Sequence, residues 1–436
     1  MTSRRLPAPA AFVAAVVSFF TMMAAAGAPS PLLVLYQQQW GFPAWQLTVA
    51  FSIYALTLLL TLLTVGALSD FVGRKPMMLS ALVVQVVAMA LFLASTDIGM
   101  IISARAVQGV ATGIATSTFS AYISEIAPPR LKSTGALLVS IAPLGGLGIG
   151  AILTGVAVQL TSAPAPLVFT VALAVFSTAL VALIFAPETV SREPGAVAAM
   201  VPRLRVPAAA RRSFMAVTPG LIGIWMAAGL MLGLSASIAH DEFHLRGGLI
   251  NGLLVALQPL TATLATVVIG PLLSSRKLVP LGYMCVLVGV TLEAGSLWLA
   301  SFPLILIGAA IAGIGFGCAF SGALGTLTPI AAAHERAELF SAIYLVGYLA
   351  YGIPTILIGV LIGKVGLSAG TLTYSAAILI ATLYALIAFL VDGRRRVQTR
   401  IRPLPESQSQ TSAGKQGASA GTEAAGRRMS TGEAHE

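Results

Sequence analysis

The sequence predicts an all-α membrane protein with twelve transmembrane helices, arranged as two six-helix bundles that are related by a pseudo-twofold repeat. Three observations predict this fold: the composition, the lengths of the apolar runs, and an internal repeat. Of the 436 residues, 57% are hydrophobic and 9% are charged, whereas soluble domains carry about 25% charged residues. This composition excludes a soluble globular protein.

Twelve apolar runs come close to the length of about 20 residues that a helix needs to cross a bilayer. The first six cover residues 11–36, 45–66, 77–95, 99–124, 135–160 and 166–186. The second six cover residues 214–238, 248–273, 279–300, 302–328, 338–363 and 369–391. The first run is longer than the apolar core of a signal peptide, so we expect it to remain as a span.

A shift of 204 positions places glycines of the first half on glycines of the second half. Gly109 falls on Gly313, and Gly155 falls on Gly359. The same shift relates helices 2, 4 and 5 to helices 8, 10 and 11, which predicts two halves with related folds.

The predicted domains follow from the repeat and from two polar stretches, 187–213 and 393–436. The stretch 393–436 is rich in Ser, Gly, Ala and Gln and lacks an apolar period, which predicts disorder. We therefore expect a first bundle over 1–186, a cytoplasmic linker over 187–213, a second bundle over 214–392 and a disordered cytoplasmic tail over 393–436.

The placement of Lys and Arg predicts the orientation in the membrane, because these residues accumulate in cytoplasmic loops. If the N-terminus lies inside, only Arg246 and Lys364 fall on outer loops, and Arg105 lies within a span. The cytoplasmic side would then hold Arg4, Arg5, Arg74, Lys75, Arg130, Lys132, Arg192, Arg203, Arg205, Arg211, Arg212, Arg276, Lys277, Arg336 and the basic residues from Arg394 onward. The net charge of +10 is thus a topology signal, and we expect both termini in the cytoplasm and no nucleic-acid partner.

A short polar stretch between the second and third spans carries the most specific motif. It fills every fixed position of the pattern G-x-L-[SA]-D-x-x-G-R-[KR] with Gly66, Leu68, Ser69, Asp70, Gly73, Arg74 and Lys75. An ordinary positively charged loop is the simpler alternative. The stretch resembles the signature between helices 2 and 3 of the major facilitator superfamily. This resemblance implies two bundles that rock around a central site, without a bound cofactor or covalent chemistry.

Helix 4 places Arg105 inside an apolar run, with Gln108 one turn further in. A charge at this depth is costly unless it faces a cavity, a partner or the interface. The pattern resembles the superfamily's R-x-x-Q-G-x-x-x-G motif, and the resemblance links Arg105 to substrate binding or proton coupling. The alternative is an Arg that anchors the helix end by reaching to the interface.

Two further loops resemble those of sugar-porter-like members of the superfamily. They contain Glu125 and Arg130 after helix 4, and Glu188 after helix 6. With Asp70 and Arg74, these residues could form an inner ion-pair network that holds the two halves together when the pocket faces outward. The alternative is that each is a solvated loop charge that contributes little stability.

Helix 5 carries Gly146, Gly150 and Gly155, a run that resembles a motif of antiporters. Ala151 and Thr154 depart from that motif, which weakens a prediction of export, and close helix packing through small residues explains the spacing equally well.

Acidic residues within the apolar runs are scarce. Helix 1 has none, although several proton-driven exporters carry one there, and Glu293 in helix 9 is a candidate proton site. His240, Asp241, Glu242 and His244 lie at a helix end, where a solvated surface is expected and no metal site. Candidates for the lining of a central pocket, besides Gln108, are Ser18, Met22, Trp225, Met226, Met231, Gln258 and Ser321.

The sequence thus predicts a monomeric secondary transporter of the cytoplasmic membrane, with membrane lipids and a small-molecule substrate as its partners. The leading hypothesis is efflux of a small organic compound, driven by the proton gradient. Proton-coupled uptake of a sugar or an organic acid is the alternative, and a transporter-like receptor or sensor is a rival from another class. A membrane-embedded enzyme is disfavoured, since the spans contain no paired acids and no H-E-x-x-H motif.

Overall fold

The structure is a computed structural model that describes residues 6–202, 204–245, 247–332 and 335–401, with side chains to residue 391. Within these ranges it contains helices and connecting turns and no strand. Among the described residues, twelve segments are long and apolar enough to cross a membrane. The predicted all-α fold with twelve spans is therefore confirmed.

The first six spans are built from eight helices, because two of the spans are interrupted. The first span is α1 and α2, and the fifth contains α7, the π-helical turn η2 and α8. The helices are α1 (Ala8–Gly27), α2 (Pro29–Trp40), α3 (Ala44–Val65), α5 (Arg74–Leu93), α6 (Ile98–Ile126), α7 (Lys132–Ile141), η2 (Ala142–Gly146), α8 (Leu147–Leu160) and α9 (Pro164–Ile184). The short helix α4 (Ser69–Val72) and the 3₁₀ turn η1 (Pro129–Leu131) lie in the connections.

The second six spans are single long helices. They are α11 (Ala208–Asp241), α12 (Gly248–Val268), α13 (Ser275–Trp298), α14 (Phe302–Leu327), α15 (Arg336–Val365) and α16 (Leu367–Ile401). The 3₁₀ turn η3 (Gly270–Leu272) follows α12, and α10 (Ala196–Ala199) lies in the connection between the halves.

Two boundaries differ from the prediction. The seventh span begins at Ala208, so its first turn takes up the end of the predicted linker. Helix α16 continues to Ile401, so residues 393–401 of the predicted disordered tail are helical. The rest of the tail, 402–436, lies outside the described residues, as do Arg4, Arg5, Arg203 and Arg246. Contacts group the described chain up to Leu390 into one compact unit, which ends within α16.

Prolines explain where the first and fifth spans are interrupted. Pro29 and Pro31 open α2, since a proline cannot donate the backbone hydrogen bond that would continue α1. Pro143 lies in the π-helical turn that separates α7 from α8. A missing donor within a helix is commonly accommodated by such a wider turn.

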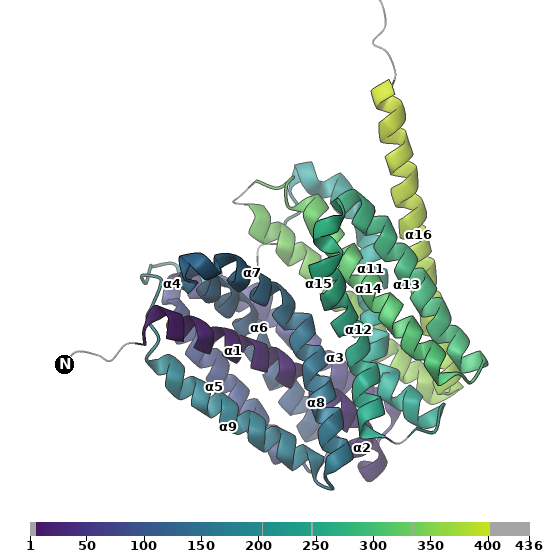
Figure 1. Cartoon of the computed structure of the whole chain (residues 1–436), viewed down its shortest axis with the longest axis horizontal. Coiled ribbons are helices and arrows are strands. Elements are labelled where there is room, and N and C mark those ends of the chain that lie inside the picture. Colours follow the sequence, from purple (N-terminus) through teal and green to yellow (C-terminus); the bar gives the residue numbers. More distant parts are fainter. Residues whose placement is uncertain (1–5, 203, 246, 333–334, 402–436) are drawn as a thin grey trace, which may run out of the picture. The chain divides into compact units, whose positions relative to one another are not determined.

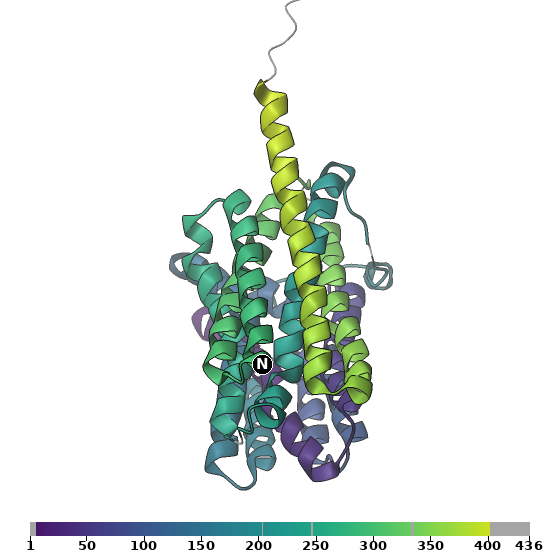
Figure 2. The same ribbon diagram turned by 90° about the vertical axis from the view of Figure 1, so that its right-hand side faces the viewer.

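In Figure 1, α1, α5 and α9 of the first half run diagonally, whereas α12 and α13 of the second half stand more steeply, and Figure 2 shows the same helices turned by 90°. The purple-to-blue helices of the first half lie on one side in Figure 1, and the teal-to-green helices of the second half lie on the other. The halves meet where α8 packs on α12 and where α3 packs on α15. Two large apolar clusters form the core, one centred on α1, α5 and α6 and the other on α11, α14 and α15, and each includes a few residues of the other half.

The repeat is visible in individual contacts. Thr57 of α3 hydrogen-bonds to the carbonyl groups three and four residues earlier in its helix and lies against Gly109 of α6. Thr261 of α12 makes the same pair of hydrogen bonds and lies against Gly313 of α14. Both pairs are 204 positions apart, so the predicted register between the halves is confirmed at this helix crossing.

Candidate functional site

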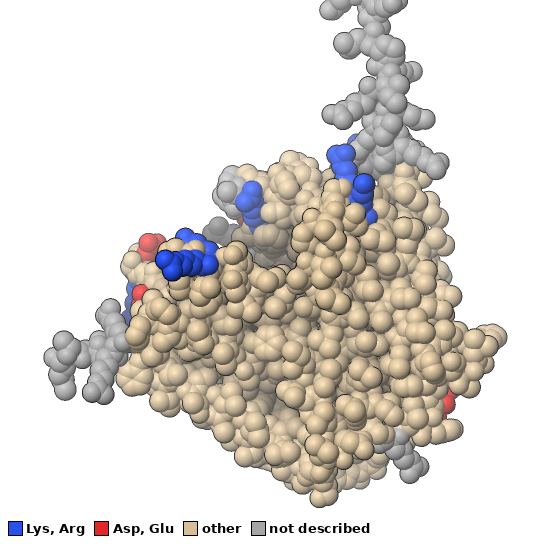
Figure 3. Space-filling view, in the orientation of Figure 1, with Lys and Arg blue, Asp and Glu red and all other residues tan. Residues whose placement is uncertain are grey.

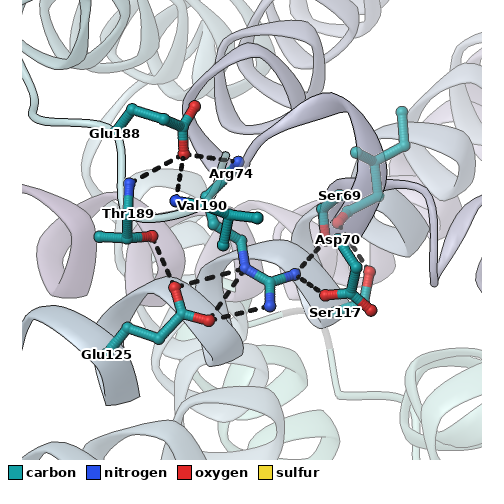
Figure 4. Close-up of polar contacts among 9 residues, drawn as sticks. Ser69, Asp70, Arg74, Ser117, Glu125, Glu188, Thr189 and Val190 are labelled. Carbon is teal, nitrogen blue, oxygen red and sulfur yellow. Dashed lines mark hydrogen bonds and ion pairs between the residues drawn. The ribbon is translucent and has the colours of Figure 1, made fainter. Parts of the chain in front are cut away.

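Arg74 is the centre of a polar network at the start of α5 (Figure 4). Its Nε and Nη2 donate to Oε1 of Glu125 at 3.1 and 2.9 Å. Its Nη1 lies 2.5 Å from Oδ1 of Asp70 and 2.6 Å from Oγ of Ser69. Thr189 donates to Glu125 at 2.5 Å, which holds the carboxylate in place. An Arg that donates twice to one carboxylate is fixed in orientation as well as bound.

Glu188 caps the first turn of α5. Its carboxylate accepts from the backbone N–H groups of Arg74 at 2.8 Å and of Lys75 at 3.1 Å. These donors have no partner within the helix, and a negative charge is favoured at a helix N-terminus. Gly73 has a φ of 106°, and a Cβ at this position would lie 2.6 Å from Oε2 of Glu188. Glycine therefore permits both the turn and the cap.

The prediction that this network holds the halves together concerns a pocket that faces outward, and it stays a prediction. Every residue in it belongs to the first half or to the start of the connection that follows α9, so in this structure it braces the first half internally and does not join the halves. Arg130 lies exposed in η1 and makes no polar contact with the described residues. The three atoms nearest to the Cβ position of Gly66 belong to Leu62, one turn earlier, so none of them comes from a neighbouring helix.

Arg105 is fully buried and joins three helices of the first half. Its Nε donates to the carbonyl oxygen of Ala50 in α3 at 3.2 Å, and its Nη1 donates to that of Ala26 in α1 at 3.1 Å. Its Nη1 also donates to Oε1 of Gln108 at 2.7 Å. Gln108 in turn donates to the carbonyl oxygen of Ala25 at 2.8 Å. With 1% of its surface exposed, Arg105 does not reach the membrane interface, so the anchoring alternative is wrong for this structure.

The helix 5 glycines lie where helices approach most closely. Gly146 and Gly150 face α1, and a Cβ on Gly150 would collide with the carbonyl group of Ala24. Gly155 faces the second half, where its Cβ position is 2.8 Å from Cα of Gly252. The run thus packs α8 against α1 on one side and α12 on the other.

The two contacts between the halves are equivalent under the repeat. Gly155 of α8 lies against Gly252 of α12, and Gly359 of α15 lies against Thr48 of α3. The shift of 204 relates Gly155 to Gly359 and Thr48 to Gly252, so one pair of residues is the repeat of the other. All four residues lie towards one end of the bundle, and the first residues of α5, α7, α13 and α15 lie at the other end. We call the latter the basic end, because these starts carry Arg74, Lys132, Arg276 and Arg336, and Figure 3 shows Lys and Arg gathered along the edge at which α4 and α7 lie.

Comparison with known proteins agrees with this architecture. The family model described as Major Facilitator Superfamily matches residues 12–353. The chain belongs to the Major Facilitator Superfamily. Among solved structures, it resembles the peptide transporter POT in complex with sulfate, with a TM-score of 0.70, 15% identity, and 88% of this chain and 95% of that chain covered. At this identity the likeness shows the fold.

Curated relatives of this superfamily member match over short stretches. Monosaccharide-sensing protein 1 of Arabidopsis thaliana is 32% identical over 101 residues, which is 23% of this chain and 14% of that protein. Myo-inositol transporter 2 of Schizosaccharomyces pombe is 31% identical over 88 residues, which is 20% of this chain and 16% of that protein. The chain thus matches less than a fifth of the length of either relative.

The predicted pocket residues of this transporter are found in different surroundings. Ser18 and Met22 are buried in the core of the first half, where Ser18 donates to the carbonyl group of Ala14. Ser321 is partly exposed and donates to Thr266 of α12 at 3.3 Å. Gln258 is buried, and its carboxamide has no hydrogen-bond partner among the described residues. Ser18 and Met22 therefore do not line an open surface in this structure.

Trp225 lies in α11 at the centre of an aromatic cluster that was not among the predicted features. Its ring is 4.9 Å from that of Tyr348, 5.5 Å from that of Phe316 and 5.9 Å from that of Phe320. One signal could have revealed the cluster: the tyrosines of α15 recur at positions 344, 348 and 351, which is the spacing of one helix face.

Glu293 faces a neighbouring helix. It is 3% exposed, and its Cγ lies 2.9 Å from the Cβ position of Gly308 in α14. Neither carboxyl oxygen has a hydrogen-bond partner in the part of the chain that the structure describes. A proton-binding role for Glu293 therefore stays a prediction.

One short motif in the sequence bears on the enzyme alternative. Residues 366–370 match G-x-S-x-G with Ser368 at the centre. A nucleophile of this type needs a sharp turn from a strand into a helix, whereas Ser368 lies in the first turn of α16, directly after the end of α15. The match gives no support to an enzyme.

Proposed function

We propose that this superfamily member is a secondary active transporter that exports a small organic compound in exchange for protons. The observation that carries the proposal is the pair of equivalent contacts between the halves. Glycines lie at both contacts, so the helix backbones approach closely there, and larger side chains such as Leu56 and Leu260 interlock over only part of each contact. Two contacts related by a pseudo-twofold axis suit halves that rock against each other around a central site.

The direction of transport is supported by helix 5. Its glycine run resembles the motif of antiporters, and in the structure it is the part of the first half that packs on α12. The proton gradient would supply the energy, without a bound cofactor. We further propose that the basic end faces the cytoplasm, since Lys and Arg accumulate on that side of membrane proteins. The protein would then be a monomer in the cytoplasmic membrane with both termini inside.

Proton-coupled uptake of a sugar or cyclitol is the second candidate. It is favoured by the two curated relatives, one of which is named as a myo-inositol transporter and the other as a monosaccharide-sensing protein. Because the matched stretches are short, we rank this candidate below export.

The deciding experiment measures proton movement that is driven by a substrate gradient in proteoliposomes with a trapped pH dye. The panel contains neutral aromatic amides, sugars, myo-inositol and organic acids. Export by antiport predicts that protons move against the compound. Movement of compound and protons in the same direction would establish the uptake candidate instead. Compound flux without proton movement would refute proton coupling in both.

A further inference from the structure

We propose that a wall of aromatic rings in the second half binds an uncharged, planar aromatic compound with a polar substituent. The inference rests on the proposed transport function and names the class of its substrate. The wall consists of Phe316 and Phe320 on α14 and of Tyr344 and Tyr348 on α15. Neighbouring rings follow one another at centroid distances of 5.8, 6.3 and 6.1 Å, which makes the surface continuous.

The tyrosines show that the wall faces the space between the halves. Tyr344, Tyr348 and Tyr351 lie on one face of α15, because residues three or four positions apart are neighbours on a helix. The ring of Tyr351 is 5.1 Å from that of Phe51 in α3, so this face points at the first half. Towards the basic end, Tyr344 and Tyr348 are partly exposed on the same face. Both rings are therefore accessible on the face of α15 that, further along at Tyr351, contacts α3.

Phe316, which is 4% exposed, and the partly exposed Phe320 are held in place from behind. Trp225 is 9% exposed and stands edge-on to Phe316 and Phe320, at interplanar angles of 68° and 80°. A Cβ on Gly347 would lie 2.5 Å from the ring of Trp225, so α15 approaches α11 closely through this glycine. Rings fixed in this way present flat apolar faces, against which another planar ring can stack.

The charges around the wall determine the class of ligand. The stretches 302–327, 339–363 and 213–239, which include the wall and Trp225, contain no Asp, Glu, Lys or Arg. The guanidinium group of Arg105 lies 4.3 Å from the ring centre of Tyr54, but its donors bind backbone carbonyl groups and Gln108. An uncharged ligand therefore fits this surface better than an anion or a cation.

The polar groups of the wall are few. The hydroxyl groups of Tyr344 and Tyr348 make no hydrogen bond with any described residue, and each can donate to or accept from a ligand. A sugar or cyclitol presents a hydroxyl on nearly every carbon, and most of these would remain unpaired against aromatic faces, which is unfavourable. A flat ring that carries one amide, carbonyl or hydroxyl group matches the wall.

Equilibrium dialysis of the detergent-solubilised full chain tests this proposal, with protein-free micelles as the blank. The probes are 2-naphthamide, its saturated counterpart decahydro-2-naphthamide, and myo-inositol. We expect 2-naphthamide to bind about tenfold more tightly than the saturated amide, since only the planar ring can stack on the wall. Equal affinity of the two amides, or tighter binding of myo-inositol, would overturn the proposal.

Variants locate the site. Tyr348→Leu should weaken 2-naphthamide binding about tenfold, whereas Tyr348→Phe, which keeps the ring, should weaken it by less. Tyr384→Leu is the matched control, because Tyr384 is 64% exposed on α16. If Tyr348→Leu does not fold, Tyr344→Leu takes its place. Unchanged binding in the folded leucine variant would refute the site. Dialysis involves no proton gradient, so failure of the proposed antiport would not change the binding result. Failure of 2-naphthamide to bind would in turn leave the proposed antiport untouched.

Discussion

At the scale of single residues, Arg105 is the least ordinary feature of the molecule. It is a buried cation whose hydrogen-bond partners among the described residues are backbone carbonyl groups and an amide, with no carboxylate among them. Such a group costs free energy to bury, and an apolar residue of similar size often restores stability. Its retention in the membrane region therefore suits a role in transport more than a role in folding.

A double-mutant cycle separates these roles. Gln108→Leu should lower the free energy of unfolding by about 1–3 kcal/mol, because it leaves a buried guanidinium N–H without a partner. Arg105→Met should cost less stability and should abolish proton-coupled transport. Thermal unfolding in detergent measures the first effect, and proteoliposome flux measures the second. If the double variant is no more stable than Gln108→Leu alone, the unpaired-donor explanation fails.

The helix cap of α5 gives a second prediction. Glu188→Ala should destabilise the protein by about 1 kcal/mol, since two N–H groups lose their acceptor. Glu193→Ala is the matched control: Glu193 lies exposed in the same connection, and its backbone N–H, which the substitution keeps, donates to Phe71. Chemical denaturation in mixed micelles compares the two. An equal loss in both variants would show that the cap contributes nothing specific.

How far a residue could be predicted depends on what it contacts. The pairing of Arg105 with Gln108 follows from their spacing on one helix. The carbonyl partners in α1 and α3 could not be foreseen, because backbone atoms leave no mark in a sequence. The motif predicted a turn at Gly73, but it could not reveal that the network would stay within one half.

At the scale of helices, α8 has the most constrained surface, since it packs on both α1 and α12. Gly155→Val should push α12 away and reduce transport by at least about tenfold, because the new side chain would overlap Gly248 and Gly252. Gly363→Val is the matched control, since no atom lies within 4 Å of its Cβ position on α15. Full activity of Gly155→Val in the flux assay would contradict the packing account.

The helices themselves were predictable, because apolar runs of membrane length admit few other structures. The points at which two of the spans are interrupted were harder to predict. Pro143 signals a disturbance in the fifth span, but the sequence does not say whether the helix breaks, kinks or widens into a π turn. The outcome depends on the neighbouring helices that satisfy the freed backbone groups.

At the scale of the whole molecule, the contact between the halves can be fixed covalently. The Cβ position of Gly352 in α15 lies 3.8 Å from Cβ of Ser52 in α3, which is the separation found in disulfides. In a background without Cys285 and Cys318, Ser52→Cys with Gly352→Cys should cross-link on oxidation and stop transport. A reducing agent should restore it. Undiminished transport in the fully cross-linked protein would refute the rocking of the halves, and each single cysteine variant serves as a control.

The relation between the halves was predictable to the residue, because the 204-position shift recurs at the interface. Gly148 lies against Leu260, and Gly352 lies against Leu56, which is the same pair under that shift. What the repeat could not supply is the aromatic wall, since the first half has no equivalent of it: Phe316 and Phe320 correspond to Thr112 and Thr116.

The brace around Arg74 also has no counterpart in the second half, where Ser274 replaces the acidic residue and neither Arg276 nor Lys277 forms an ion pair with a described residue. The two halves should therefore differ in how readily their basic ends open for a moment to solvent. Amide protons in the first turn of α5 should exchange with deuterium more slowly than those in the first turn of α13. Although the two halves share a fold, the first would thus be more rigid at its basic end than the second.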